Sequence, residues 1–260
     1  MSGSPLDQVR ETFGDLDLWG QRLADVHLPE PGSDLAEDDR DWPVFPMSQV
    51  AVSGLAAARD HLQAVRVHID ARQLFPFAQA SLIRTATLAA AQVVWILAPD
   101  EREDRISNAR TLTRHVYDEF RKFLRDLQDL PPGPDADTEG VKRLVEQRLA
   151  ELAQKRAADE QKSAFEATRT IGLAADATWG RPEMALAAKV EWRRGSAAAH
   201  GLAWSVFGQP GTRQAGGPDS DGVAPFEAGG SIEALANPYL CAHGLLANGF
   251  NLLDARSVCP

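Results

Sequence analysis

The segment at residues 77–97 constrains the fold more than any other, because it is apolar on most of its helical circumference. A helix without a polar face has to be surrounded by other elements, so this segment predicts a central core helix. Its most apolar run, at 86–98, is interrupted by Thr87 and Gln92, whereas a membrane span needs about 20 apolar residues. We therefore expect a buried helix and no membrane partner.

Helical periodicity continues on both sides of this core segment. The predicted helices lie at residues 6–24, 49–73, 77–97, 100–127, 138–160, 163–178, 182–207 and 231–255. No segment shows the alternation that is typical of a strand. The predicted fold class is all-α, a helical bundle of seven to eight helices with an acidic N-terminal arm.

The arm and the bundle form the predicted domain organisation. Residues 1–48 are the acidic N-terminal arm, with one helix, and residues 49–260 are the bundle. The Pro-rich stretch 131–137 is a hinge candidate between two halves of the bundle. The Gly/Pro-rich stretch 208–230 lacks periodicity and is long enough to be a mobile or functional loop.

Charge is distributed unevenly along the chain. The formal charge is −10, and the arm holds eleven acids and three arginines, so it carries −8 and leaves −2 for the remainder. Such a balance argues against non-specific binding of the whole protein to nucleic acid, which needs clustered cations, and leaves room for a local basic site. The acids at 38–41 sit in a Pro-rich setting, so we interpret them as a solvated loop and expect no metal site.

Cysteine usage and the first residues indicate the compartment. Cys241 and Cys259 are the only cysteines, too few for a disulfide framework or a zinc site, and they fit a reducing environment. Residues 1–10 show neither a basic start nor an apolar run, so no signal peptide is expected. We expect a cytoplasmic protein without a cofactor.

The segment 191–204 carries the chemistry that stands out. On a continuous helix, Arg193, Ser196, His200 and Trp204 share one stripe, while Arg194 points roughly 120° away from His200. Alanines and glycines leave little bulk beside the stripe, so a helix, a partner subunit or a ligand can approach it closely.

This pattern resembles the Arg-x(4–6)-His signature of the HEPN superfamily, near the start of a late helix. A wider resemblance to all-α proteins of actinobacteria covers 82–86, 95–100, 192–193 and 196–201. The resemblance implies a helical bundle that acts as a homodimer and a metal-independent endoribonuclease, as an RNA-cleaving or RNA-binding toxin or defence effector. It implies that His200 is the general acid/base or organises the 2′-hydroxyl, and that Arg193 or Arg194 holds the scissile phosphate.

Two other functions fit the same residues, so whether the chain is an enzyme stays open. In one, the protein is a non-catalytic interaction module with a protein partner, His200 is buried between small residues, and the arginines form ion pairs, for example with Glu191. In the other, the protein binds a small molecule in a cavity near His200. The residues expected to line that cavity are Ser81, Arg84, Thr85, Gln92 and Ser196. Arg84 would line this cavity or form a buried ion pair.

Overall fold

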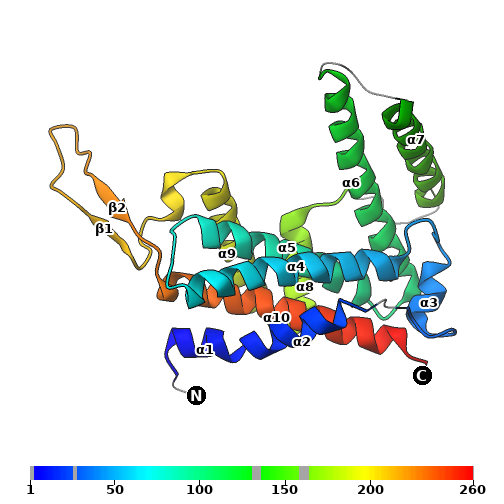
Figure 1. Ribbon diagram of the computed structural model, residues 1–260, viewed down its shortest axis with the longest axis horizontal. Coiled ribbons are helices and arrows are strands. Elements are labelled where there is room, and N and C mark those ends of the chain that lie inside the picture. The colour runs from blue at the N-terminus through cyan, green and yellow to red at the C-terminus, as the bar shows by residue number, and fades with distance from the viewer. Residues whose placement is uncertain (1–2, 26–27, 131–135, 158–163, 260) are drawn as a thin grey trace.

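The computed structural model describes residues 3–25, 28–130, 136–157 and 164–259, and it confirms the all-α fold (Figure 1). The helices are α1 (Pro5–Glu11), α2 (Phe13–Arg22), α3 (Asp34–Asp39), α4 (Met47–Asp70), α5 (Ala78–Leu97), α6 (Arg102–Gln128), α7 (Ala136–Arg156), α8 (Ala167–Trp179), α9 (Pro182–Ala199) and α10 (Ile232–Ser257). Helices α4 to α8 and α10 begin and end within four residues of the predicted bounds.

Helix α5 is the centre of the bundle. It runs beside α4 and α10 along the long axis of the molecule, and α8 and α9 also pack against it (Figure 1). Its core face includes Ala86, Ala90 and Val94, which are fully buried. Among the described residues, α5 is the one helix long and apolar enough to cross a membrane, and half of its most apolar window is buried against these neighbours.

The acidic N-terminal segment is part of the bundle and forms three helices, where we expected an arm with one. Thr12 separates α1 from α2, and its hydroxyl donates to the carbonyl of Val9 at 2.7 Å. Helix α1 packs against α10, and α2 and α3 pack against α4. Val9, Leu16 and Leu35 are fully buried, so this segment completes the core.

The acids at 38–41 hold the segment in place and do not form the solvated loop we expected. Asp38 is buried and accepts a hydrogen bond at 2.7 Å from Nε of Arg105, itself buried on α6. Asp41 pairs with Arg110 of α6 at 2.8 Å. The α6 arginines therefore offset the excess of acids in the N-terminal segment.

Helices α6 and α7 form a hairpin that projects from the body of the bundle (Figure 1). Its outer part has a small apolar core of its own, built from Leu124, Val145 and Leu149 with Tyr117 and Leu127 beside them. Of the hinge candidate 131–137, the first five residues lie outside the described residues, and the last two begin α7.

The segment after α9 differs most from the prediction. The expected helix at 182–207 ends at Ala199 and is followed by a short 3-10 turn, η1 (Ala203–Ser205). The expected loop at 208–230 contains two antiparallel strands, β1 (Thr212–Gln214) and β2 (Phe226–Ala228), that pair Arg213 with Glu227. This hairpin projects from the end of the molecule opposite α6 and α7 (Figure 1).

Candidate functional site

Helix α9 ends inside the motif that the sequence analysis singled out. His200 is the C-cap residue, and Gly201 has a φ of +67°, a left-handed conformation that glycine adopts readily and that terminates helices. The single stripe expected for Arg193, Ser196, His200 and Trp204 therefore stops at Ala199, since Trp204 lies on η1. The motif also lies at the end of its helix, where the resemblance implies a position near the start.

Arg193 and His200 are both exposed to solvent. His200 is consequently not the buried, hydrogen-bonded histidine that the interaction-module hypothesis requires. Both side chains are accessible to a large partner from outside the bundle. Arg194, the alternative arginine of the motif, is half-buried.

Arg84 and Ser196 join α5 to α9. Nε of Arg84 donates to Oγ of Ser196 at 2.9 Å, and the guanidinium lies 5.6 Å from the ring centroid of Trp192. The described residues offer Arg84 no carboxylate in an ion pair, so the buried ion pair considered for it is not formed. The two helices approach closely at Gly195, where an added Cβ would lie 2.7 Å from Cβ of Arg84.

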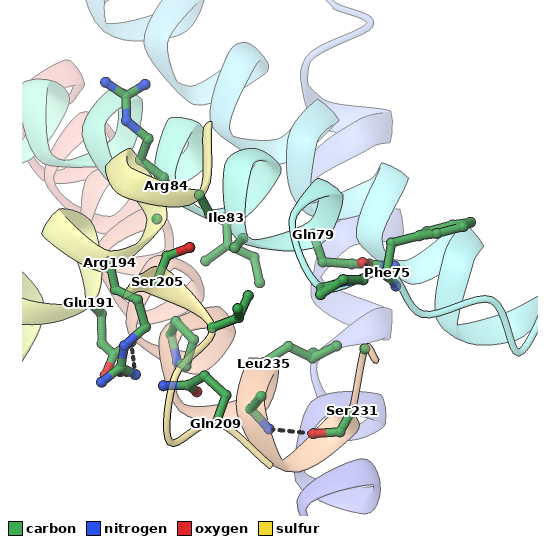
Figure 2. A pocket seen from close by; sticks show the side chains of 18 of the residues that line it. Phe75, Gln79, Ile83, Arg84, Glu191, Arg194, Ser205, Gln209, Ser231 and Leu235 are labelled. Carbon is green, nitrogen blue, oxygen red and sulfur yellow. Dashed lines mark hydrogen bonds and ion pairs between the residues drawn. The ribbon is translucent and has the colours of Figure 1, made fainter. Parts of the chain in front are cut away.

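A cavity lies between α5, α9, α10 and the segment 205–231 (Figure 2). It measures about 690 Å³ including the part open to solvent, and about 60 Å³ of it can hold the centre of a water molecule. Its apolar wall consists mainly of Phe75, Ile83, Ala198, Val206, Leu235 and Pro238. A mostly apolar, narrow cavity with a few polar groups is the usual form of a small-molecule site.

One wall of the cavity is polar. Nη1 of Arg194 donates to both carboxylate oxygens of Glu191 at 3.1 Å, one helical turn before it on α9. Gln209 lies beside this pair, and when its amide oxygen faces Arg194 it accepts from Nε at 3.1 Å and from Nη1 at 3.2 Å (Figure 2). Burial raises the pKa of Glu191, and the charge of Arg194 opposes that rise.

Two further polar groups of the cavity wall lack their ordinary partners. Oγ1 of Thr212 is buried and makes no hydrogen bond with the described residues. Pro238 lies inside α10 and has no N–H, so the carbonyl of Ala234 lacks its usual helical donor. A buried hydroxyl without a partner is uncommon, because its desolvation costs free energy that a hydrogen bond recovers.

Of the residues proposed from the sequence, the structure brings Arg84 and Arg194 to the cavity. Arg193, Ser196, His200 and Gln92 do not line it. Ser81 and Thr85, which belong to the expected polar stripe of α5, do not line the cavity either. Their hydroxyls donate to backbone carbonyls four residues earlier in the same helix, at 2.9 and 3.0 Å. Arg84 lines the cavity with its aliphatic part, since its guanidinium points away (Figure 2).

Sequence reasoning treated Glu191 only as an ion-pair partner and missed Gln209 and Thr212 as cavity residues. The spacing of Glu191 and Arg194, three residues apart on a helix, was a usable signal for their pairing. Gln209 and Thr212 carry no comparable signal, because they come from an irregular segment whose path the sequence did not reveal.

Two findings concern metal ligands and the thiol of Cys241 in the part of the chain that the structure describes. It contains no group of three His, Cys, Asp or Glu side chains that could hold a metal ion. Burial raises the pKa of Cys241 to about 12, with a further contribution from Glu191, so this thiol is protonated at neutral pH and is a poor nucleophile.

Comparison of the sequence with models of known protein families and with curated proteins gave no match, and comparison with solved structures gave none either. The features that bear on function are therefore the cavity and the end of α9.

Proposed function

We propose that this protein binds a small, mainly apolar molecule in the cavity between α5, α9 and α10. The observation that carries the proposal is the cavity itself, about 690 Å³ including the part open to solvent, with a mainly apolar lining and one polar wall. A ligand with an apolar body and one polar end would match such a lining. The pair of Arg194 and Glu191 would fix its orientation.

Binding is tested by titrating the protein with pentan-1-ol while following the methyl NMR signals of Ile83, Val206 and Leu235, which line the cavity. We expect saturable shifts in the wild type and none in Ala234→Phe, whose ring would fill the cavity. Ala57→Phe, at an exposed position of α4, is the matched control and should bind as the wild type does. Absence of saturable shifts in the folded wild type would contradict the proposal.

RNA cleavage is a second candidate, favoured by the exposure of both Arg193 and His200 at one end of α9. In this proposal the chain is a homodimer that brings two such pairs to one RNA. His200 would exchange a proton with the 2′-hydroxyl, and Arg193 would stabilise charge on the phosphate.

Incubation with mixed cellular RNA in the presence of chelator tests this candidate. We expect cleavage with cyclic-phosphate ends for the wild type and none for His200→Ala, which should stay folded because the side chain is exposed. His115→Ala, at a partly exposed histidine of α6, should cleave normally. Intact RNA with the wild type and both variants would remove this candidate and leave the cavity proposal untouched.

A further inference from the structure

The outer part of the hairpin of α6 and α7 exposes two rows of apolar side chains. Val116, Phe120 and Phe123 follow one another at helical spacing on α6, and Val141 and Leu144 do so on α7. Between 38 and 56% of each of these five side chains is exposed. Each row gives its helix an apolar side, and such a side is normally covered by another element.

Both rows lie on the same face of the hairpin. On the other face, Arg121 and Arg125 of α6 border one groove together with Lys142 and Glu146 of α7. At about 100° per residue, these charged residues lie to one side of the hairpin core on each helix, and the apolar rows lie to the other side. Since the charged residues of the two helices meet on one face, the apolar rows share the opposite one, which we call the apolar face.

Among the described residues, no other element covers the apolar face. Helix α7 packs mainly against α6, and the hairpin stands clear of the bundle (Figure 1). Between its two helices the hairpin buries only Leu124, Val145 and Leu149. A pair of helices covers one side of each member, so the apolar face needs a partner from outside the chain.

The area of the apolar face suits one side of a stable protein interface. With about 150–250 Å² for a whole phenylalanine side chain and less for valine and leucine, the exposed fractions amount to roughly 400 Å² of apolar surface. A standard interface buries about 800 Å² on each partner, of which a little more than half is apolar. The five side chains therefore supply most of the apolar area that such an interface needs.

The charges beside the apolar face favour a second copy as the partner. The chain carries a formal charge of −10, so two copies repel each other unless the surfaces that meet are locally balanced. Glu119 pairs with Lys122 at 2.6 Å, and Glu151 pairs with Arg148 at 2.8 Å, so these two acids bordering the face are neutralised in place. A second copy also presents a hairpin of the same length, and two hairpins can bury their apolar sides in a four-helix bundle.

We propose that the apolar face of the hairpin docks against the same face of a second copy of this chain around a two-fold axis, so that the two hairpins form a four-helix bundle. Phe120 and Phe123 have the largest side chains of the face and are its main anchors. Neither candidate function uses this face, so the proposal stands or fails independently of both.

Sedimentation velocity of the whole chain over a range of concentrations tests the proposal. We expect the wild type to shift from monomer to dimer as its concentration rises. Phe123→Glu should raise the dissociation constant at least about thirtyfold, because it buries a carboxylate among apolar side chains without a counter-charge. The variant should stay folded by circular dichroism, since Phe123 is exposed in the single chain. Val67→Glu places the same charge at an exposed valine of α4 and should dimerise as the wild type does.

Hydrogen exchange locates the contact. When the dimer forms, we expect slower exchange in α7 and in the outer half of α6, and no change in α4. A wild type that stays monomeric at every concentration would overturn the proposal. So would a dimer that Phe123→Glu leaves intact, or one whose added protection lies only in other elements.

Discussion

Gly195 determines how closely α9 approaches α5. A methyl group there would lie 2.7 Å from Cβ of Arg84 and 2.9 Å from the carbonyl oxygen of Ala80, so the helices would have to separate. We expect Gly195→Ala to lower the free energy of unfolding by about 1–3 kcal/mol, as overpacking in a close contact usually does. Chemical denaturation followed by circular dichroism measures this change.

Gly140 is the matched control, because it also lies within a helix and an added Cβ there meets nothing within 4 Å. Gly140→Ala should leave stability unchanged or raise it by up to about 1 kcal/mol through helix propensity. If Gly195→Ala proved as stable as Gly140→Ala, the close contact between α5 and α9 would not exist as described.

His243 gives the stability a dependence on pH. Burial against Trp19 lowers its pKa below the ordinary 6.5, although the carboxylate of Asp15 at 3.0 Å opposes this effect. The unfolded chain therefore binds the proton more readily, and protonation favours unfolding. We expect the free energy of unfolding to fall as pH drops through about 6.5 toward the lower folded value, and to level off below it.

Denaturation curves at several pH values for the wild type and His243→Gln measure this contribution. The loss of stability in that window should be smaller in the variant, because the variant has no group to protonate there. Parallel stability curves for the two proteins would show that the pH dependence has another origin.

At the residue scale, the chemistry of the site was only partly predictable. Arg194 and Arg84 stood out because a charged side chain in a mostly apolar or small-residue helix is uncommon and usually has a partner or a function. The stripe through His200 failed because it assumed one helix up to residue 207, although Gly201 is the kind of residue that ends helices. Thr212 could not be predicted, since its place depends on how the segment after α9 folds back.

The hairpin of α6 and α7 has a core that is separate from the main one. We expect Val145→Ala, which removes buried methyl groups from this small core, to open the outer hairpin locally. Hydrogen exchange should accelerate in α7 and in the outer half of α6, while amides of α4, α5 and α10 keep their protection. Uniform acceleration across the molecule would instead show that the hairpin unfolds together with the bundle.

At the element scale, long amphipathic helices were predictable and short or irregular pieces were not. The bounds of α5 follow from a mostly apolar run of 20 residues, and those of α6 from apolar periodicity over 27 residues. Helix α3 has six residues, which are too few to show helical periodicity. It also lies in a stretch rich in prolines and acids, so the sequence did not indicate a helix there. Strands β1 and β2 have three residues each and an exposed pattern that resembles a loop.

The molecule as a whole depends on the buried pair of Asp38 and Arg105, which ties the N-terminal segment to α6. We expect Asp38→Ala to lower the free energy of unfolding by about 3–5 kcal/mol, because it leaves the buried Arg105 with only the more distant carboxylate of Asp34, at 3.8 Å. Glu37→Ala removes only the exposed pair with Arg40 and should cost less than about 1 kcal/mol. Similar losses in both variants, measured by urea denaturation, would contradict a special role for the buried pair.

The order of the helices along the chain has a consequence for biosynthesis. Among the described helices α10 is made after all the others, yet it packs against α5, α4 and α1, which leave the ribosome long before it. Until α10 emerges, the nascent chain exposes the apolar face of α5 that α10 covers. A ribosome paused shortly before codon 232 would therefore present a chain that chaperones bind and proteases degrade, and release from that pause would let the bundle close.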